Sequence, residues 1–135
     1  MTVPGSLILL GGSPGVGKST LSLHICSELN QKSLYFSAEE SEEQVALRAR
    51  RLEIKTENLF LSGESDLNGI ITHLERMEPK FVIIDSIQTI WSDKVDSAPG
   101  TVSQVRAAAY ELTTFAKRSG TSIVLVGHVT KEGQI

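Results

Sequence analysis

The chain has 135 residues, 40% of them hydrophobic, which is enough for one domain with a core of its own. Its single cysteine excludes a disulfide framework and a cysteine zinc site within the chain. A formal net charge of −3 argues against a uniformly basic nucleic-acid binder, and no apolar run approaches the ~18 residues of a membrane helix. We therefore expect a cytoplasmic protein with no membrane partner.

The first predicted elements are a strand at residues 6–11, a glycine-rich loop and a helix that runs to about Leu29. The loop fits the pattern G-x-x-x-x-G-K-[ST], in which backbone N–H groups and the helix N-terminus face phosphate oxygens. We expect Lys18 to reach the β- and γ-phosphates of a nucleotide, Ser19 to bind Mg²⁺ and Thr20 to donate to the α-phosphate. An ordinary glycine-rich turn with a helix cap is the alternative. The predicted nucleotide-binding residues of the loop are Gly12, Ser13, Pro14, Gly15, Val16, Gly17, Lys18, Ser19 and Thr20.

A second strand is predicted at residues 33–37, and a helix after Ser41, where Gln44 completes a capping box. Glu39 lies between them, just past the strand that follows the loop helix. We expect Glu39 to face the γ-phosphate and to activate the attacking water. The alternative is that Glu39 and Glu40 are a solvated pair of charges near a helix N-terminus, where negative charge is favourable.

Strands and helices continue to alternate along the rest of the chain. Several strands are apolar on both faces, which is typical of a parallel sheet covered by helices on both sides. The expected core stripe of the last helix is Val102, Val105, Ala109, Leu112 and Ala116. The predicted elements are strands at 58–61, 81–84 and 122–127, helices at 67–77 and 102–119, and an irregular segment at 91–101.

Ligands of parallel α/β sheets bind beyond the carboxyl ends of the strands, and two further candidate residues follow strands there. Asp85 follows four apolar residues, as in a Walker B strand, and we expect its carboxylate to bind Mg²⁺ through water. Its alternative role is to cap the next turn. His128 follows the last strand, where it is either a sensor of the γ-phosphate or an ordinary surface histidine.

Longer motifs extend these patterns over nearly the whole chain. They are residues 3–6 (VPGS), 37–41 (SAEES), 44–52 (QVALRARRL), 84–89 (IDSIQT), 97–106 (SAPGTVSQVR) and 126–133 (VGHVTKEG). Together with the loop they resemble the RecA-like ATPase domain of the bacterial RadA (Sms) family of DNA repair and recombination proteins. The last two motifs are specific, since general RecA-fold ATPases and replicative helicases do not share them. The resemblance implies an α/β fold, a RecA-like P-loop NTPase core in which a mostly parallel sheet carries helices on both faces.

The resemblance also implies an ATP-driven motor that acts on single-stranded DNA in strand exchange and branch migration. ATP and Mg²⁺ would be its cofactors, and a homo-oligomeric ring, a hexamer, its assembly; recombinase and replication proteins are further implied partners. The family's pattern assigns Lys18, Ser19 and Asp85 to MgATP, Glu39 to water activation and His128 to a γ-phosphate sensor.

Other implied roles concern the adenine base and the DNA. The resemblance places Arg48 against the adenine, and DNA-facing loops at residues 91–100 and 129–135. Lys131 is then a candidate for the DNA phosphate backbone. Trp91 either stacks on a base or packs half-buried against the protein.

Some features of the family are missing from residues 1–135: a four-cysteine zinc module, a Lys-Asn-Arg-Phe-Gly motif and a Lon-like C-terminal domain. Ser13 stands where aspartate is common. We therefore expect residues 1–135 to be part of a RecA-like ATPase domain, truncated at the C-terminus and weakly active alone. A ring-assembly or regulatory domain with little turnover is the alternative function. A self-phosphorylating regulator of the circadian-clock type and a small-molecule kinase fit the motifs less well.

Overall fold

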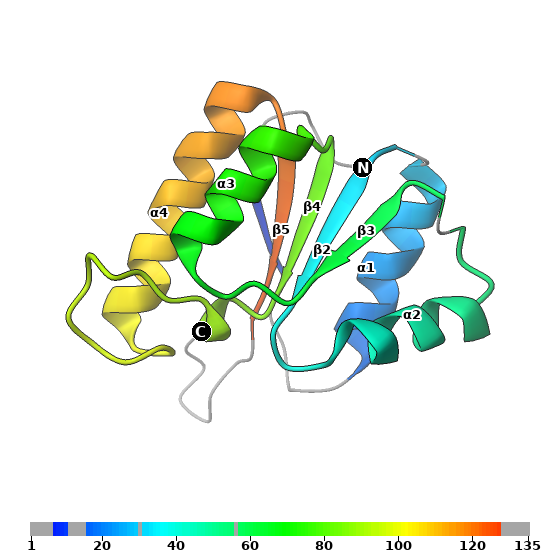
Figure 1. Cartoon of the computed structure of the whole chain (residues 1–135), viewed down its shortest axis with the longest axis horizontal. Coiled ribbons are helices and arrows are strands. Elements are labelled where there is room, and N and C mark those ends of the chain that lie inside the picture. The colour runs from blue at the N-terminus through cyan, green and yellow to red at the C-terminus, as the bar shows by residue number, and fades with distance from the viewer. Residues whose placement is uncertain (1–6, 11–15, 30, 56, 128–135) are drawn as a thin grey trace.

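The computed structural model describes residues 7–10, 16–29, 31–55 and 57–127, in which strands and helices alternate (Figure 1). None of the described helices combines the length and the apolar character needed to cross a membrane. The strands are β1 (Leu7–Leu10), β2 (Ser33–Ser37), β3 (Leu59–Ser62), β4 (Phe81–Asp85) and β5 (Ser122–Val126), and the helices are α1 (Val16–Leu29), α2 (Glu42–Arg51), α3 (Leu67–Met77), α4 (Val102–Ser119) and the short 3-10 helix η1 (Ile87–Thr89).

The strands form one sheet in the order β1-β5-β4-β2-β3, and every neighbouring pair is parallel. The predicted parallel sheet is therefore confirmed, and all the described strands end at the same edge. Strand β5 lies between β1 and β4. Since neighbouring strands are about 4.8 Å apart, the ends of β1 and β4 are separated by about 10 Å.

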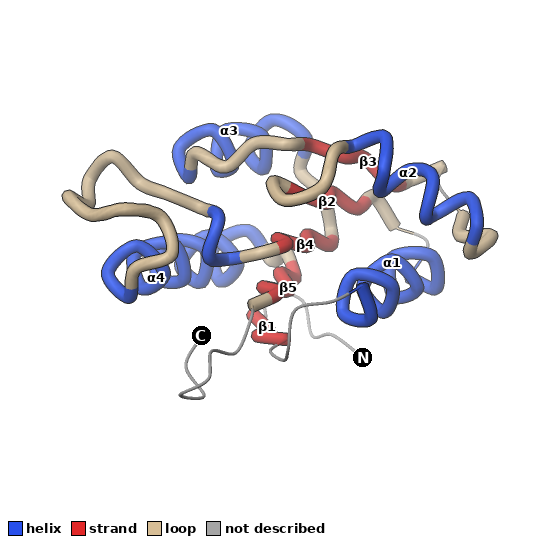
Figure 2. Tube along the Cα trace, turned by 90° about the horizontal axis from the view of Figure 1, so that it is seen from below, coloured by secondary structure: helices blue, strands red, loops and turns tan. Residues whose placement is uncertain are grey.

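Helices cover both faces of the sheet, with α1 and α2 on one face and α3 and α4 on the other (Figure 2). Alternate residues of β4 enter two separate cores, as the period of a strand requires. Phe81 and Ile83 pack in the core beneath α1 and α2, and Val82 and Ile84 in the core beneath α3 and α4. Asp85 continues the first series, so its side chain lies on the face that α1 covers.

The helix boundaries follow the signals in the sequence. At the start of α2, the Gln44 N–H donates to the Ser41 hydroxyl (3.1 Å), and the Ser41 N–H donates to Gln44 Oε1 (3.0 Å). The predicted capping box is therefore confirmed. Helix α4 ends at Gly120, whose φ of 77° is a left-handed conformation that glycine adopts without strain.

The predicted core stripe of α4 is partly wrong. Val102 is 53% exposed, whereas Gln104 is only 2% exposed. Leu112 and Ala116 are buried as expected, with Ala108 and Phe115 beside them. Gln104 points inward, where its side-chain amide forms hydrogen bonds with the backbone of Ser92 and Ser97 in the preceding loop. A core stripe predicted from apolar residues alone does not include such a contact.

Candidate functional site

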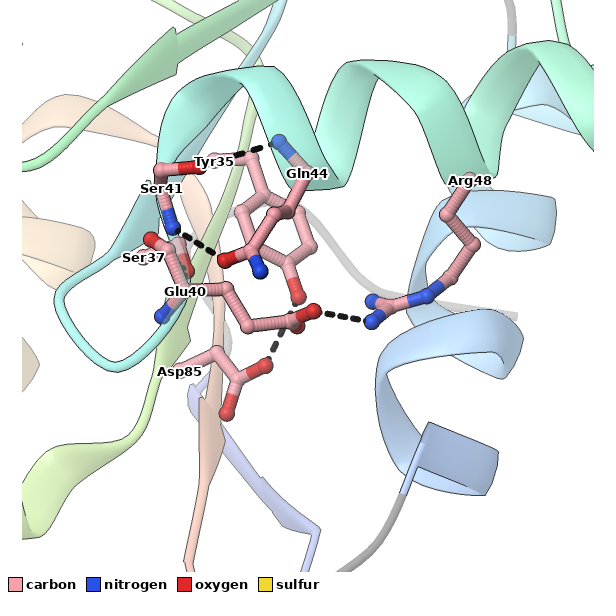
Figure 3. Close-up of polar contacts among 7 residues, drawn as sticks. All are labelled: Tyr35, Ser37, Glu40, Ser41, Gln44, Arg48 and Asp85. Carbon is pink, nitrogen blue, oxygen red and sulfur yellow. Dashed lines mark hydrogen bonds and ion pairs between the residues drawn. The ribbon is translucent and has the colours of Figure 1, made fainter.

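Asp85 is the last residue of β4, and its carboxylate lies at the carboxyl edge of the sheet. Asp85 is 9% exposed, and its Oδ2 accepts a hydrogen bond of 2.7 Å from the Tyr35 hydroxyl (Figure 3). In the sheet register, Ser37 pairs with Asp85 and Tyr35 pairs with Ile83. Tyr35 therefore lies on the same face of the sheet as Asp85, and its side chain reaches diagonally from β2 to Asp85 on the neighbouring strand β4.

Glu39 belongs to a short loop that is tied to the end of β4. The Ala38 N–H donates to the Asp85 carbonyl (3.4 Å), and the Ser86 hydroxyl donates to Glu39 Oε1 (3.1 Å). Within the loop, the Ser37 hydroxyl donates to the Glu40 carbonyl (3.0 Å) and accepts from the Glu40 N–H (3.3 Å). The structure thus brings the predicted residues Glu39 and Asp85 together at the end of β4.

The neighbouring carboxylate, that of Glu40, has a different partner. It forms an ion pair with the Arg48 guanidinium, which reaches back from the second turn of α2 (Figure 3). The Glu40 side chain is 30% exposed and the Arg48 side chain 17% exposed, so the ion pair is partly shielded from solvent. Glu39 and Glu40 therefore serve different contacts although they are adjacent in the chain.

Helix α1, which the predicted phosphate loop leads into, begins at this same edge of the sheet (Figure 1). Thr20 lies within α1 and is half-buried. For Val16, Gly17, Lys18 and Ser19 the structure describes the helical backbone but not the side chains. The other predicted residues of the loop, Gly12, Ser13, Pro14 and Gly15, lie outside the described residues, as do His128 and Lys131.

Trp91 lies at the start of the irregular segment that precedes α4, and its side chain is half-buried. The backbone around it is paired: the Trp91 N–H donates to the Ser65 carbonyl (3.0 Å), and the Trp91 carbonyl accepts from the Leu67 N–H (2.9 Å). Gln104 of α4 then holds the next residues of the segment. The predicted DNA-facing loop is therefore anchored at its beginning by backbone and side-chain hydrogen bonds.

Tyr35, Ser86 and Gln104 are among the residues of these networks that the sequence did not predict as site residues. A signal for Tyr35 was present, since a tyrosine in a buried strand needs a partner for its hydroxyl. Ser86 directly follows Asp85, so its place beside the site could have been predicted, although its bond to Glu39 could not. Gln104 carried no signal, because a glutamine in a helix is ordinarily exposed.

Comparison with known proteins places the chain in a family. Residues 1–134 match the family described as AAA domain. The chain belongs to this family. It is also 49% identical to the DNA repair protein RadA of Bacillus subtilis and 50% identical to that of Escherichia coli, in both cases over 98% of the chain. The resemblance to RadA is thereby confirmed, and the chain spans about 30% of the length of these relatives.

Solved structures support the predicted fold class. A KaiC-like protein of the archaeon Pyrococcus horikoshii superposes with a TM-score of 0.72 over 98% of the chain and 65% of its own length, at 17% identity. A DnaB-like replicative helicase superposes with a TM-score of 0.77 over 97% of the chain and 40% of its own, at 13% identity. At these identities the likeness concerns the fold, and it confirms an α/β architecture of the RecA-like P-loop NTPase type.

Proposed function

We propose that the chain binds MgATP at the carboxyl edge of its sheet and hydrolyses it, as part of the RecA-like ATPase domain of a DNA repair protein. The observation that carries the proposal is the joining of Glu39 to the end of β4 through the Ser86 hydroxyl. Ser86 directly follows Asp85, the proposed metal ligand, so this contact supports a role of Glu39 in activating water. The end of β4 is about 10 Å from the end of β1, the strand that leads into the phosphate loop.

The phosphate loop would supply most of the binding energy for the nucleotide. Its backbone N–H groups and the N-terminus of α1 favour the phosphates, and Lys18 neutralises charge on the β- and γ-phosphates. Thr20 donates to the α-phosphate, and Arg48 contacts the adenine base.

Ser19 and Asp85 are the proposed ligands of Mg²⁺. The chemistry of these oxygen donors supports the proposal, because Mg²⁺ prefers oxygen ligands and commonly binds through one or two carboxylates together with substrate phosphates. Asp85 offers such a carboxylate at a strand end, with one oxygen already held by the Tyr35 hydroxyl. When bound, Mg²⁺ would neutralise negative charge on the phosphates.

Glu39 is the proposed base for hydrolysis. It orients the attacking water and accepts its proton as the water oxygen bonds to the γ-phosphorus and the bond from that phosphorus to the leaving ADP oxygen breaks, which gives ADP and phosphate. The Ser86 hydroxyl restricts the orientation of the carboxylate, which favours a fixed water position. His128 would sense whether the γ-phosphate is present.

The DNA-related part of the proposal rests on the relatives, which carry the name DNA repair protein. We propose that the intact protein acts on single-stranded DNA in strand exchange and branch migration as a homo-oligomeric ring. With a net charge of −3, DNA contacts must be local rather than spread over the surface. Lys131 on the phosphate backbone and Trp91 on a base are the proposed contacts.

The test is ATP hydrolysis by the 135-residue chain, with and without single-stranded DNA, against Lys18→Ala. Lys55→Ala is the matched control, because Lys55 is an exposed lysine outside the site. We expect weak basal hydrolysis, stimulated by DNA, that Lys18→Ala abolishes and Lys55→Ala preserves. Equal rates in all three chains would contradict the role of Lys18. Nucleotide-dependent oligomers with no turnover would instead favour a ring-assembly domain.

A further inference from the structure

Tyr35 places a polar group inside an otherwise apolar core. Tyr35 is fully buried, with 0% of its surface exposed, in the hydrophobic core beneath α1 and α2. Among the other buried residues of this core are Leu23, Val45 and Ile83. The hydroxyl is satisfied by Asp85 Oδ2 at 2.7 Å, in a hydrogen bond that is itself buried (Figure 3).

The sheet register explains how this bond forms. Leu34 and Phe36 enter the core beneath α3 and α4, so Tyr35 between them faces the opposite core. Strands β2 and β4 are parallel, and Tyr35 lies opposite Ile83. Asp85 is two residues beyond Ile83 on the same strand, so its side chain is the next one on that face. The tyrosine ring spans this diagonal and delivers its hydroxyl to the carboxylate at the strand end.

The bond is not needed to join the two strands. Strands β2 and β4 pair in register over five residues, from Ser33 opposite Phe81 to Ser37 opposite Asp85. The bond instead affects the Asp85 carboxylate. The packed ring fixes the Tyr35 hydroxyl, and a fixed donor restricts rotation of the Asp85 side chain. Partners that hold a metal-binding side chain in this way commonly contribute to metal affinity.

We propose that Tyr35 is a positioning residue for magnesium: its hydroxyl holds Asp85 Oδ2 so that the carboxylate is oriented for Mg²⁺ before nucleotide binds. This inference rests on the proposed function, since it takes Asp85 as a ligand of Mg²⁺. Tyr35 itself touches neither metal nor nucleotide. Its loss should weaken the response to Mg²⁺ and leave metal-independent nucleotide binding unchanged.

The experiment compares Tyr35→Phe with the intact 135-residue chain by calorimetric titration of ATP at a series of Mg²⁺ concentrations and in EDTA. Tyr110→Phe is the matched control, because it removes the same hydroxyl from a side chain that is 74% exposed on α4. We expect Tyr35→Phe to raise the Mg²⁺ concentration for half-maximal tightening of ATP binding about tenfold. Binding in EDTA should not change, and Tyr110→Phe should behave as the unaltered chain.

A double-mutant cycle with Asp85→Asn tests whether the effect passes through Asp85. In the Asp85→Asn background, Tyr35→Phe should produce no further shift of the Mg²⁺ midpoint. A midpoint that Tyr35→Phe leaves unchanged, or a shift of the same size in both backgrounds, would overturn the inference while the proposed function stands. An unaltered chain that binds ATP without any dependence on Mg²⁺, or not at all, would overturn the proposed function itself. Unchanged thermal unfolding and ATP binding in EDTA establish that Tyr35→Phe is folded.

Discussion

Replacing Gln104 should release the segment that leads into α4. The Gln104 amide makes several contacts with this segment: its Oε1 accepts from the Ser92 N–H (2.8 Å), and its Nε2 lies within donating distance of the carbonyls of Ser97 (2.8 Å), Ser92 (3.2 Å) and Val95 (3.3 Å). Gln104→Met keeps the length of the side chain and its fit in the core while removing every one of these bonds. We expect the segment to open locally while the sheet remains folded.

The size of the effect follows from the number of bonds that can form at once. An amide nitrogen has two N–H groups, so its three acceptors share two donors, and the side chain contributes about three full hydrogen bonds. At about 0.5–1.5 kcal/mol each, their loss lowers the free energy of local opening by about 1.5–4.5 kcal/mol. Since 1.36 kcal/mol is a factor of ten, the Ser92 amide should exchange with solvent roughly 10- to 2000-fold faster.

The assay is native-state hydrogen exchange followed by mass spectrometry on peptides that contain residues 91–101. Ser103→Ala is the control, because Ser103 is the exposed neighbour of Gln104 on the same helix. Exchange in the strand peptides should be the same in all chains. If Gln104→Met exchanged its 91–101 peptides as slowly as the Ser103→Ala control, the holding role of Gln104 would be refuted.

Two further predictions concern a serine beside the site and the buried cysteine. Ser86→Ala removes the hydroxyl that donates to Glu39 Oε1, so the rate of phosphate release at saturating ATP should fall about tenfold with little change in the KM for ATP, and an unchanged rate would argue against Glu39 as the base. Burial raises the pKa of the Cys26 thiol from its ordinary value of 9.0 to about 12, so its contribution to stability is complete below pH 9 and is lost as the pH rises toward 12. In urea unfolding at pH 8 and pH 10, the unaltered chain should lose about 1.4 kcal/mol more than Cys26→Ala between the two values, and equal losses would count against the burial effect.

The sequence contained the elements whose signals are local. The capping box at Ser41 and Gln44 depends on residues three apart, and the left-handed end of α4 depends on Gly120. The meeting of Glu39 with Asp85 was also within reach of sequence reasoning, because parallel strands end at one edge of their sheet. The alternation of strands and helices likewise predicted the type of sheet, and with it the edge at which the candidate site lies.

Two contacts could not be predicted from the sequence. The bond from Tyr35 to Asp85 requires β2 to lie beside β4, although β3 lies between them in the chain. The burial of Gln104 requires the path of the preceding loop, which no periodic pattern describes. In both cases the partners of a buried polar group set its position: Asp85 in a neighbouring strand for Tyr35, and the backbone of an irregular loop for Gln104. A pattern of hydrophobic residues does not predict either contact.

The most direct measurement of the central claim is calorimetric titration of MgATP into the 135-residue chain and into Lys18→Ala. The account predicts saturable heat of binding for the unaltered chain, and affinity at least tenfold weaker when the lysine is removed. Absence of any binding heat from the unaltered chain at saturating MgATP, or the same affinity in both chains, would contradict a nucleotide site built from the glycine-rich loop and Asp85.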